Sequence, residues 1–194
     1  MQRALLFDTL ADVLAYPGVE YRVHMARAVA LLRTLHAHPF ADAQVRIEGA
    51  DLDEAVASLE RFAAATADLT TSGFEELYTR TFDINPACAL ELGWHLHGES
   101  YDRGAFLVRM RSLLARFELA ESGELPDHIC HALAVFGRMP DDEARVFARE
   151  TLRPAITPMR EALGTVDNPY DNVLAAVEAT LHTWCTHPAG VSIP

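Results

Sequence analysis

The chain has 194 residues, half of them hydrophobic and 23% charged, a balance typical of a globular and not a disordered protein. Its 16 basic and 28 acidic residues give a formal net charge of −12. This charge argues against nucleic acid and anionic membranes as partners and suits a basic peptide better. Three cysteines without a CxxC spacing argue against a disulfide framework and favour a reducing compartment.

Apolar residues recur at helical spacing along most of the chain, and runs of Val, Ile and Thr with period two are nearly absent. Prolines, glycines and capping residues mark where helices are expected to begin or end. In chain order, the expected helices contain or begin at Leu6, Tyr21, Asp51, Ser72, Pro86, Tyr101, Pro126, Pro140 and Asn168, with Pro154 and Pro158 kinking or dividing the stretch before Gly164.

These patterns predict an all-α fold, a single-domain helical bundle of about eight to ten helices over residues 1–194. Within it, residues 1–70 form N-terminal helices, residues 40–50 are irregular, and the tail 187–194 is loose. The loop at 120–126 could act as a hinge for exchange of helices between protomers, so both a monomer and a homodimer remain open.

The first helix has an apolar stripe interrupted by Asp8 and Asp12, which predicts an amphipathic helix and not a signal peptide. No stretch of the sequence is apolar for long enough to span a membrane. We therefore expect a cytoplasmic protein without direct membrane insertion.

Glu124, Pro126, Asp127 and His128 place two carboxylates and an imidazole within five residues. The proline disfavours helical geometry at the residue before it, which predicts a helix starting near Pro126. Asp127 is then expected in the first turn, where its charge suits the helix dipole. Taken alone, this stretch has the features of an ordinary capped helix start.

A small metal-dependent enzyme is the alternative that the residues leave open, using some of His95, His97, His128, His131 and Cys130. Imidazoles at i and i+2 of a helix point apart, whereas i and i+3 are better placed, and no set of four ligands has a tight spacing. Because no catalytic motif is present, we expect neither an enzyme nor a resident cofactor.

The segment from Gly93 to Ser100 has the outline of a phosphate-binding loop, but Glu99 stands where that loop needs a lysine. Glu99 would repel a phosphate, and no strand is expected before the segment. The four aromatic residues around it are expected to pack in the core, or else to line a groove for an apolar helix or peptide: Tyr78, Phe82, Trp94 and Tyr101.

Three motifs together resemble a known family: Tyr-x-x-x-Phe-Asp and His-Gly-Glu-x-x-Asp-Arg-Gly within residues 78–104, and Glu-Leu-Pro-Asp-His at 124–128. With Asn168-Pro-Tyr170, they are similar to the TorD/DmsD/NarJ assembly chaperones of molybdenum oxidoreductases, and closest to the NarJ branch, the nitrate reductase delta subunits. The similarity is loose in the first 70 residues. The segment from Ile84 to Trp94 is more similar to TorD-type or dehydrogenase-associated members, so the client subunit stays open.

The resemblance implies a system-specific chaperone that binds the N-terminal peptide of a molybdoenzyme catalytic subunit. Such a chaperone assists insertion of the molybdenum cofactor before export or membrane docking. In the family, the motif at residues 124–128 is associated with recognition of the leader peptide. We expect exposed carboxylates to meet the cationic part of the peptide, with Asp127 facing the cation, and aromatic residues to meet its apolar part. The expected peptide-binding residues are Tyr78, Phe82, Trp94, Glu99, Tyr101, Arg103, Glu124, Pro126, Asp127 and His128.

Overall fold

The fold is given by a computed structural model that describes residues 2–37 and 48–186, without the side chains of residues 183 and 184. The all-α fold predicted from the sequence is confirmed. The described residues include one isolated antiparallel β-bridge, between Glu91 and His128. The elements are α1 (Gln2–Leu14), α2 (Tyr21–Ala37), α3 (Gly49–Ala65), α4 (Thr71–Tyr78), the π-helical turn η1 (Thr79–Asp83), α5 (Leu92–His97), α6 (Tyr101–Arg116), α7 (Ile129–Arg138), α8 (Asp141–Phe147), the π-helical turn η2 (Ala148–Leu152), α9 (Arg153–Gly164) and α10 (Tyr170–Thr186).

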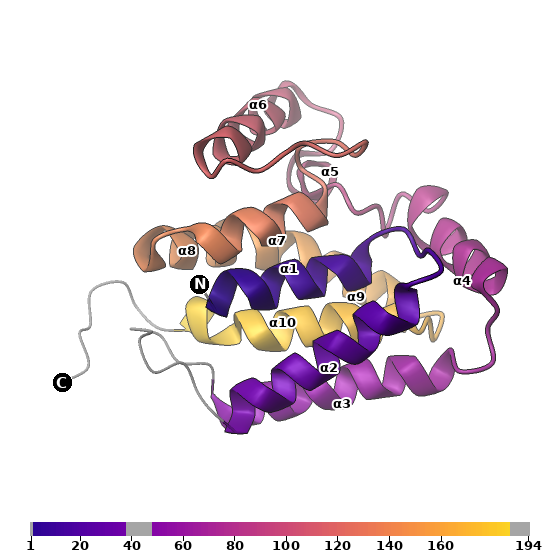
Figure 1. Ribbon diagram of the computed structural model, residues 1–194. Helices are drawn as coiled ribbons and strands as arrows, with labels where there is room; N and C mark the ends of the chain where they lie inside the picture. The colour runs from indigo at the N-terminus through magenta and orange to yellow at the C-terminus, as the bar shows by residue number, and fades with distance from the viewer. Residues whose placement is uncertain (1, 38–47, 187–194) are drawn as a thin grey trace.

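The helices form a bundle whose centre is made by α1, α7, α9 and α10, with antiparallel α2 and α3 covering one side (Figure 1). Helix α1 packs against α7 and α2, and α10 packs against α3 and α9. Helix α6 lies at the end of the molecule opposite α3 and packs on α5 and α7. The segment from α5 to the start of α7 therefore stands out from the bundle.

Helices α1 and α7 cross at very short range. A Cβ atom on Gly137 would lie 2.9 Å from the Cα of Ala4, so only glycine allows this approach. Beside the crossing, the rings of Phe7 and Phe136 meet edge to face at 4.6 Å. The guanidinium of Arg138 donates to both carboxylate oxygens of Asp8 at 2.7 and 2.8 Å. Packing and a paired charge together fix α7 on α1.

A cluster of aromatic rings joins η1 to the bundle. Tyr170 at the start of α10 is fully buried, and its ring centroid lies 4.7 Å from that of Phe82 and 5.0 Å from that of Phe62. Tyr78 contacts the same group at 6.0 Å from Tyr170. Because interdigitated rings hold one another in a defined orientation, η1 has a fixed position on the bundle.

The helix start expected at Pro86 is wrong, since α5 begins only at Leu92, although it ends at the C-cap Gly98, as expected. The side chain of Asn85 accepts a hydrogen bond from the backbone N–H of Ala87 at 3.2 Å and forms a turn there. Beyond the turn, Leu90 accepts a backbone hydrogen bond from Ile129 at 2.8 Å. Pairing with a distant segment keeps these residues extended.

The helix starts expected at Asp51 and Ser72 are also wrong in detail. Helix α3 begins two residues before Asp51, with Glu48 in the cap position and no side-chain cap. Helix α4 is capped by Thr70, whose hydroxyl accepts from the backbone N–H of Gly73 at 3.2 Å, two residues upstream of the predicted Ser72. Thr70 offers the same kind of oxygen, so the helix gains a further half turn.

Two other helix starts agree with the sequence. Helix α8 follows Pro140 and carries acidic residues throughout its first turn. Before α10, the side chain of Asn168 accepts from the backbone N–H of Tyr170 at 3.0 Å, as expected of a capping asparagine. The predicted loose tail 187–194 lies wholly, and the predicted irregular segment 40–50 mostly, outside the described residues.

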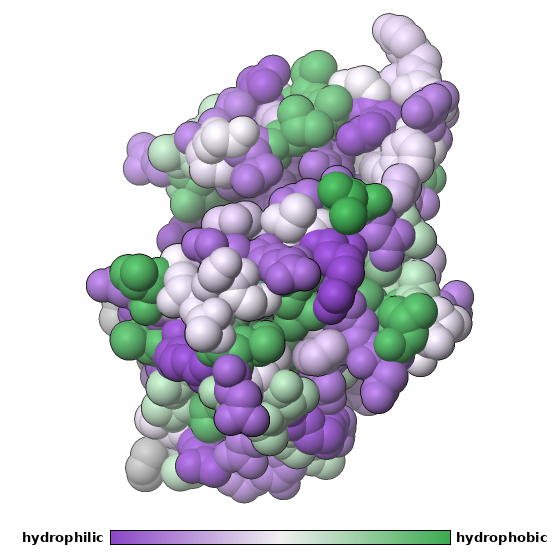
Figure 2. Space-filling view, turned by 90° about the vertical axis from the view of Figure 1, so that its right-hand side faces the viewer, coloured by the Kyte–Doolittle hydropathy of each residue, from purple (hydrophilic) through white to green (hydrophobic). Residues whose placement is uncertain are grey.

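The side of the molecule that carries α4 is shown in Figure 2, in which hydrophobic and hydrophilic side chains are interspersed in small groups. No continuous apolar area covers this view. In the described part of the chain, no helix is long and apolar enough to cross a membrane.

Candidate functional site

A cleft of about 300 Å³ lies where η1, the extended segment before α5, α5 itself, α6 and the start of α7 meet. It brings together six of the ten residues expected to bind a peptide, from parts of the chain up to fifty residues apart. The cleft is lined by Tyr78, Phe82, Asp83, Pro86, Ala89, Leu90, Glu91, Trp94, Arg103, Glu124 and His128.

Tyr78 and Phe82 form the floor of the cleft. Both side chains are buried, and their rings meet edge to face at 5.0 Å. The hydroxyl of Tyr78 donates to the backbone carbonyl of Leu14 at 3.2 Å, which ties the floor to the end of α1. The floor is therefore rigid and apolar, as the core interpretation of these two residues predicted.

Trp94 forms one wall and is half-buried. Its indole N–H donates to the backbone carbonyl of Pro86 at 2.8 Å, which fixes the orientation of the ring. The guanidinium carbon of Arg103 lies 5.6 Å from the centre of the indole, within the range of a cation–π contact. Arg103 therefore covers the Trp94 ring inside the cleft.

Three carboxylates line the cleft: Asp83 and Glu124 are exposed, and Glu91 is half-buried. Within residues 2–37 and 48–186, none of the three side chains makes an ion pair or a hydrogen bond. Arg103 is the single arginine or lysine among the lining residues. The cleft therefore presents an excess of unpaired negative charge above an apolar floor.

The predicted exposed carboxylate at Asp127 is wrong, as is its predicted place in the first turn of a helix. Asp127 is fully buried and precedes α7, which begins at Ile129 and not near Pro126. Its Oδ2 accepts from the backbone N–H of Gly93 at 2.9 Å, and its carbonyl accepts from the N–H of Leu92 at 3.0 Å. Burial raises the pKa of the Asp127 carboxyl, and the bond from Gly93 opposes this shift.

Gly93 is required for this arrangement. A Cβ atom at this position would lie 2.6 Å from Oδ2 of Asp127 and 2.9 Å from Cδ1 of Phe106. Asp127 thus occupies the space of a missing side chain and satisfies an N–H group in the first turn of α5. Asp127 therefore lies beneath the cleft and is not among the residues that line it.

His128 caps α7 and also lines the cleft. Its Nδ1 accepts from the backbone N–H of Cys130 at 3.3 Å, so Nε2 carries the proton of the neutral ring. Burial lowers the pKa of His128 to about 4, against opposing effects of Glu91 and Asp83. At neutral pH this side chain therefore offers the cleft an uncharged N–H donor.

Glu99 and Tyr101 lie in a second, open depression of about 570 Å³, which shares Arg103 with the cleft. Tyr101 is 92% exposed, so its expected place in the core is wrong. It is the first residue of α6, where the helix projects from the bundle and has no neighbour to cover it. Pro126 is buried and lines neither depression.

Sequence reasoning missed the role of His131, which holds the loop carrying Glu124. Its Nδ1 donates to the carbonyl of Leu125 at 2.9 Å, and its Nε2 accepts from the backbone N–H of Ser122 at 3.2 Å. Asp83 and Glu91 were not singled out either. Asp83 closes the quoted Tyr-x-x-x-Phe-Asp motif, which was the available signal, whereas the place of Glu91 depends on its bridge to His128.

The five residues considered for a metal site do not come together as a set, although the ring centroids of His128 and His131 lie 6.4 Å apart. Nε2 of His95 lies 2.7 Å from the carbonyl of Ala89, the ring of His97 packs on Phe106, and the thiol of Cys130 donates to the carbonyl of Ala11. Over the described ranges, no group of three or more His, Cys, Asp or Glu side chains is placed to hold a metal ion.

Comparison with known proteins shows the family to which the chain belongs. The chain is 39% identical over 84 residues to the nitrate reductase molybdenum cofactor assembly chaperone NarJ of Escherichia coli strain K12, and equally to that of Escherichia coli O157:H7. Each alignment covers 40% of this chain and 34% of the relative, so the matched part is about a third of the length of these relatives. The profile of the nitrate reductase delta subunit family matches residues 48–176, which include the whole cleft. The chain therefore belongs to the nitrate reductase delta subunit family.

Proposed function

We propose that this protein is a cytoplasmic assembly chaperone for a molybdenum oxidoreductase, with a nitrate reductase as the first candidate client. It holds the N-terminal segment of the catalytic subunit in the cleft and keeps that subunit competent for insertion of the molybdenum cofactor. Membership of the family and the similarity to the NarJ assembly chaperones support the chaperone role.

One observation carries the binding mode: Asp83, Glu91 and Glu124 are unpaired at the rim of a cleft whose floor is Tyr78 and Phe82. A segment with a basic side chain next to apolar residues matches both features. The basic group meets the carboxylates, and the apolar residues meet the rings. The N–H of His128 is available to a backbone carbonyl of the segment.

Binding in this mode needs no catalytic step by the chaperone. Its work is to cover an apolar and cationic segment until the client has been assembled. Electrostatic attraction between the acidic cleft and a basic segment speeds encounter, while contact with the aromatic floor selects the correct segment.

The test is a calorimetric titration of the full chain with synthetic N-terminal peptides of the molybdoenzyme catalytic subunits from the same organism. Saturable binding of at least one peptide is expected. A double variant, Asp83→Asn with Glu124→Gln, should weaken that binding about tenfold at low salt because two attractive charges are lost. Both residues are exposed, so the fold should persist.

The control for overall charge is Glu161→Gln, which removes one exposed carboxylate from α9 outside the cleft. It changes net charge but should leave the affinity nearly unchanged. Absence of binding by every peptide to the folded wild-type protein would contradict the proposal. Equal weakening by the control would show that net charge, and not the cleft, attracts the peptide.

A further inference from the structure

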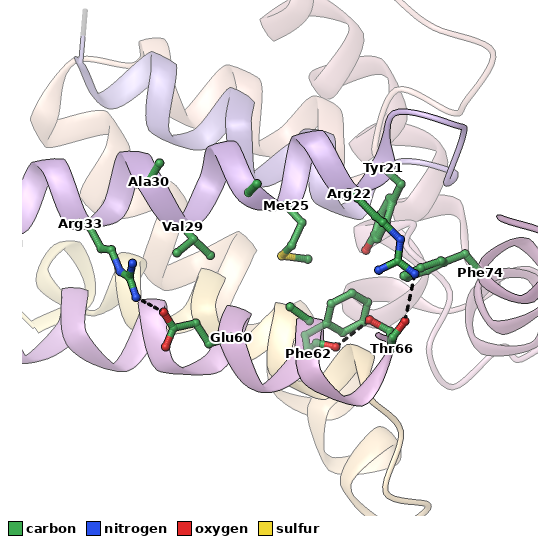
Figure 3. Close-up of a pocket in the computed structure, with 12 residues that line it drawn as sticks. Tyr21, Arg22, Met25, Val29, Ala30, Arg33, Glu60, Phe62, Thr66 and Phe74 are labelled. Carbon is green, nitrogen blue, oxygen red and sulfur yellow. Dashed lines mark hydrogen bonds and ion pairs between the residues drawn. The ribbon is translucent and has the colours of Figure 1, made fainter. Parts of the chain in front are cut away.

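A second hollow of about 400 Å³ lies between α2 and α3 and shares no residue with the cleft (Figure 3). Most of its lining is apolar. The residues that line it are Tyr21, Arg22, Met25, Ala26, Val29, Ala30, Arg33, Glu60, Phe62, Ala63, Thr66 and Phe74. We refer to this hollow as the α2–α3 groove.

The groove has the shape of a helix-binding surface. Met25 and Phe62 are buried at its base, whereas Ala26, Ala30 and Ala63 are exposed and line it. Alanines leave room for the backbone of another helix to approach closely. On α2 the lining runs from Tyr21 to Arg33, which corresponds to roughly 18 Å or three helical turns.

Charged groups stand at both ends of the groove, as Figure 3 shows. At one end Arg33 pairs with Glu60. At the other, Arg22 donates to the backbone carbonyls of Ala67 and Leu69 at 3.0 and 2.7 Å, and its guanidinium carbon lies 5.1 Å from the centre of the Phe74 ring. These acceptors are uncharged, so the positive charge of Arg22 is not matched by a carboxylate there.

The whole of α2 is basic, although the chain has a net charge of −12. The helix carries three arginines and no acidic residue, and its two histidines lie opposite the carboxylates of Glu20 and Asp53. Glu60 compensates Arg33, but Arg27, exposed beside Ala26, makes no ion pair with any described residue. The α2 edge of the groove is thus positive, opposite in sign to the cleft.

We infer that the α2–α3 groove docks an amphipathic helix of a partner protein, with an apolar stripe about three turns long and carboxylates beside that stripe. The apolar stripe covers the groove between the alanines, and the carboxylates face Arg22 and Arg27. The charge of its surface selects an acidic helix, whereas the cleft selects a basic segment. The inference does not depend on the proposed function, because it concerns other residues and the opposite charge.

The experiment titrates the full chain with two fluorescent synthetic peptides of about 14 residues, long enough for three to four turns. Both carry leucines at i, i+3, i+4 and i+7, and the residues flanking this stripe are glutamate in one peptide and lysine in the other. Fluorescence anisotropy at low salt should show saturable binding of the glutamate peptide. The lysine peptide matches the basic segment proposed for the cleft, so any binding of it should be weakened by the Asp83→Asn, Glu124→Gln double variant and left unchanged by Ala30→Trp.

Two variants locate the binding. Ala30→Trp fills the groove and should weaken binding of the glutamate peptide at least about tenfold, because the bulky ring occupies the space of the apolar stripe. Its control is Ala115→Trp, an exposed alanine on α6. Arg27→Glu should weaken binding about threefold to tenfold, and its control is Arg109→Glu on α6, also exposed. Circular dichroism confirms that each variant is folded.

Three results would overturn the inference. One is no saturable binding of the glutamate peptide by the folded wild-type protein. Another is equal binding of the wild type and Ala30→Trp, which would place the peptide elsewhere. The third is a dimer in sedimentation velocity that Ala30→Trp converts to a monomer, which would show that a second copy of this chain fills the groove.

Discussion

The Oδ2 atom of Asp127 accepts a hydrogen bond from the backbone N–H of Gly93 at 2.9 Å, across 34 residues of sequence. This bond joins the residue before the α7 cap to the first turn of α5. Glu91 and Trp94 lie on one side of this bond and His128 on the other, so it is the side-chain contact that joins the two walls of the cleft. Backbone hydrogen bonds from Leu92 to Asp127 and from Ile129 to Leu90 join the same two segments.

Replacing Asp127 should therefore affect stability together with peptide binding. Asp127→Ala leaves the N–H of Gly93 buried without an acceptor, at an expected cost of about 1–3 kcal/mol in the free energy of unfolding. Asp127→Asn keeps an acceptor oxygen and should cost less. Urea unfolding followed by peptide titration measures both effects. A fully stable Asp127→Ala protein that has lost binding would instead show that the carboxylate contacts the peptide.

Gly93→Ala should distort the same contact from the other side. The added Cβ would lie 2.6 Å from the Asp127 carboxylate, and overpacking of this kind costs about 1–3 kcal/mol. The matched control is Gly104→Ala in α6, where no atom lies within 4 Å of the added Cβ. The free energy of unfolding of the control should rise by about 0.5–1 kcal/mol, because alanine suits a helix interior better than glycine. Thermal unfolding of both variants tests the sign of each change.

Stability should fall as the pH drops from about 6.5 toward 4, because His128 is buried in its neutral form. Its pKa in the folded protein is lowered to about 4, so in this window the unfolded chain binds the extra proton. The stabilisation is complete above the ordinary histidine pKa and is lost as the pH falls through the lowered one. Once the pH is below both pKa values of His128, the free energy of unfolding has fallen by about 3 kcal/mol on account of this residue.

The control for this pH dependence is His128→Asn, which retains a side-chain acceptor for the N–H of Cys130 at the start of α7. Urea midpoints measured across the window should decline less steeply in the variant than in the wild type. Parallel curves would assign the acid sensitivity to other groups, among which His131, Glu91 and Asp83 act on His128 most directly.

Arg103 should limit the affinity of the cleft for basic peptides. Its guanidinium already occupies the face of Trp94, and it is the single arginine or lysine that lines the cleft. Arg103→Gln removes that competitor and should tighten binding of a basic peptide about threefold to tenfold at low salt. Arg103→Lys keeps the charge and should show a smaller gain, and Arg109→Gln, on the same helix but outside the cleft, should show none. Weaker binding by Arg103→Gln would mean that Arg103 itself contacts the peptide.

The sequence by itself determined the helical fold and many of its boundaries, because helical periodicity and capping act over a few residues. The acidic first turn of α8 and the asparagine cap of α10 are examples. It also pointed to the two stretches, 78–104 and 124–128, that meet in the cleft. Where a local signal had a competitor nearby, as with Thr70 upstream of Ser72, the predicted boundary was wrong.

Only the tertiary structure decided which polar side chains face solvent. Asp127 and Glu124 are three residues apart and equally acidic, yet one is buried and the other exposed, because Gly93 from another helix offers Asp127 a partner and a space. In the same way, neither α2 nor α3 alone forms a groove. Burial and cavity shape depend on neighbours distant in sequence, whereas helix formation depends on neighbours close in sequence, and this difference separates what could be predicted from what could not.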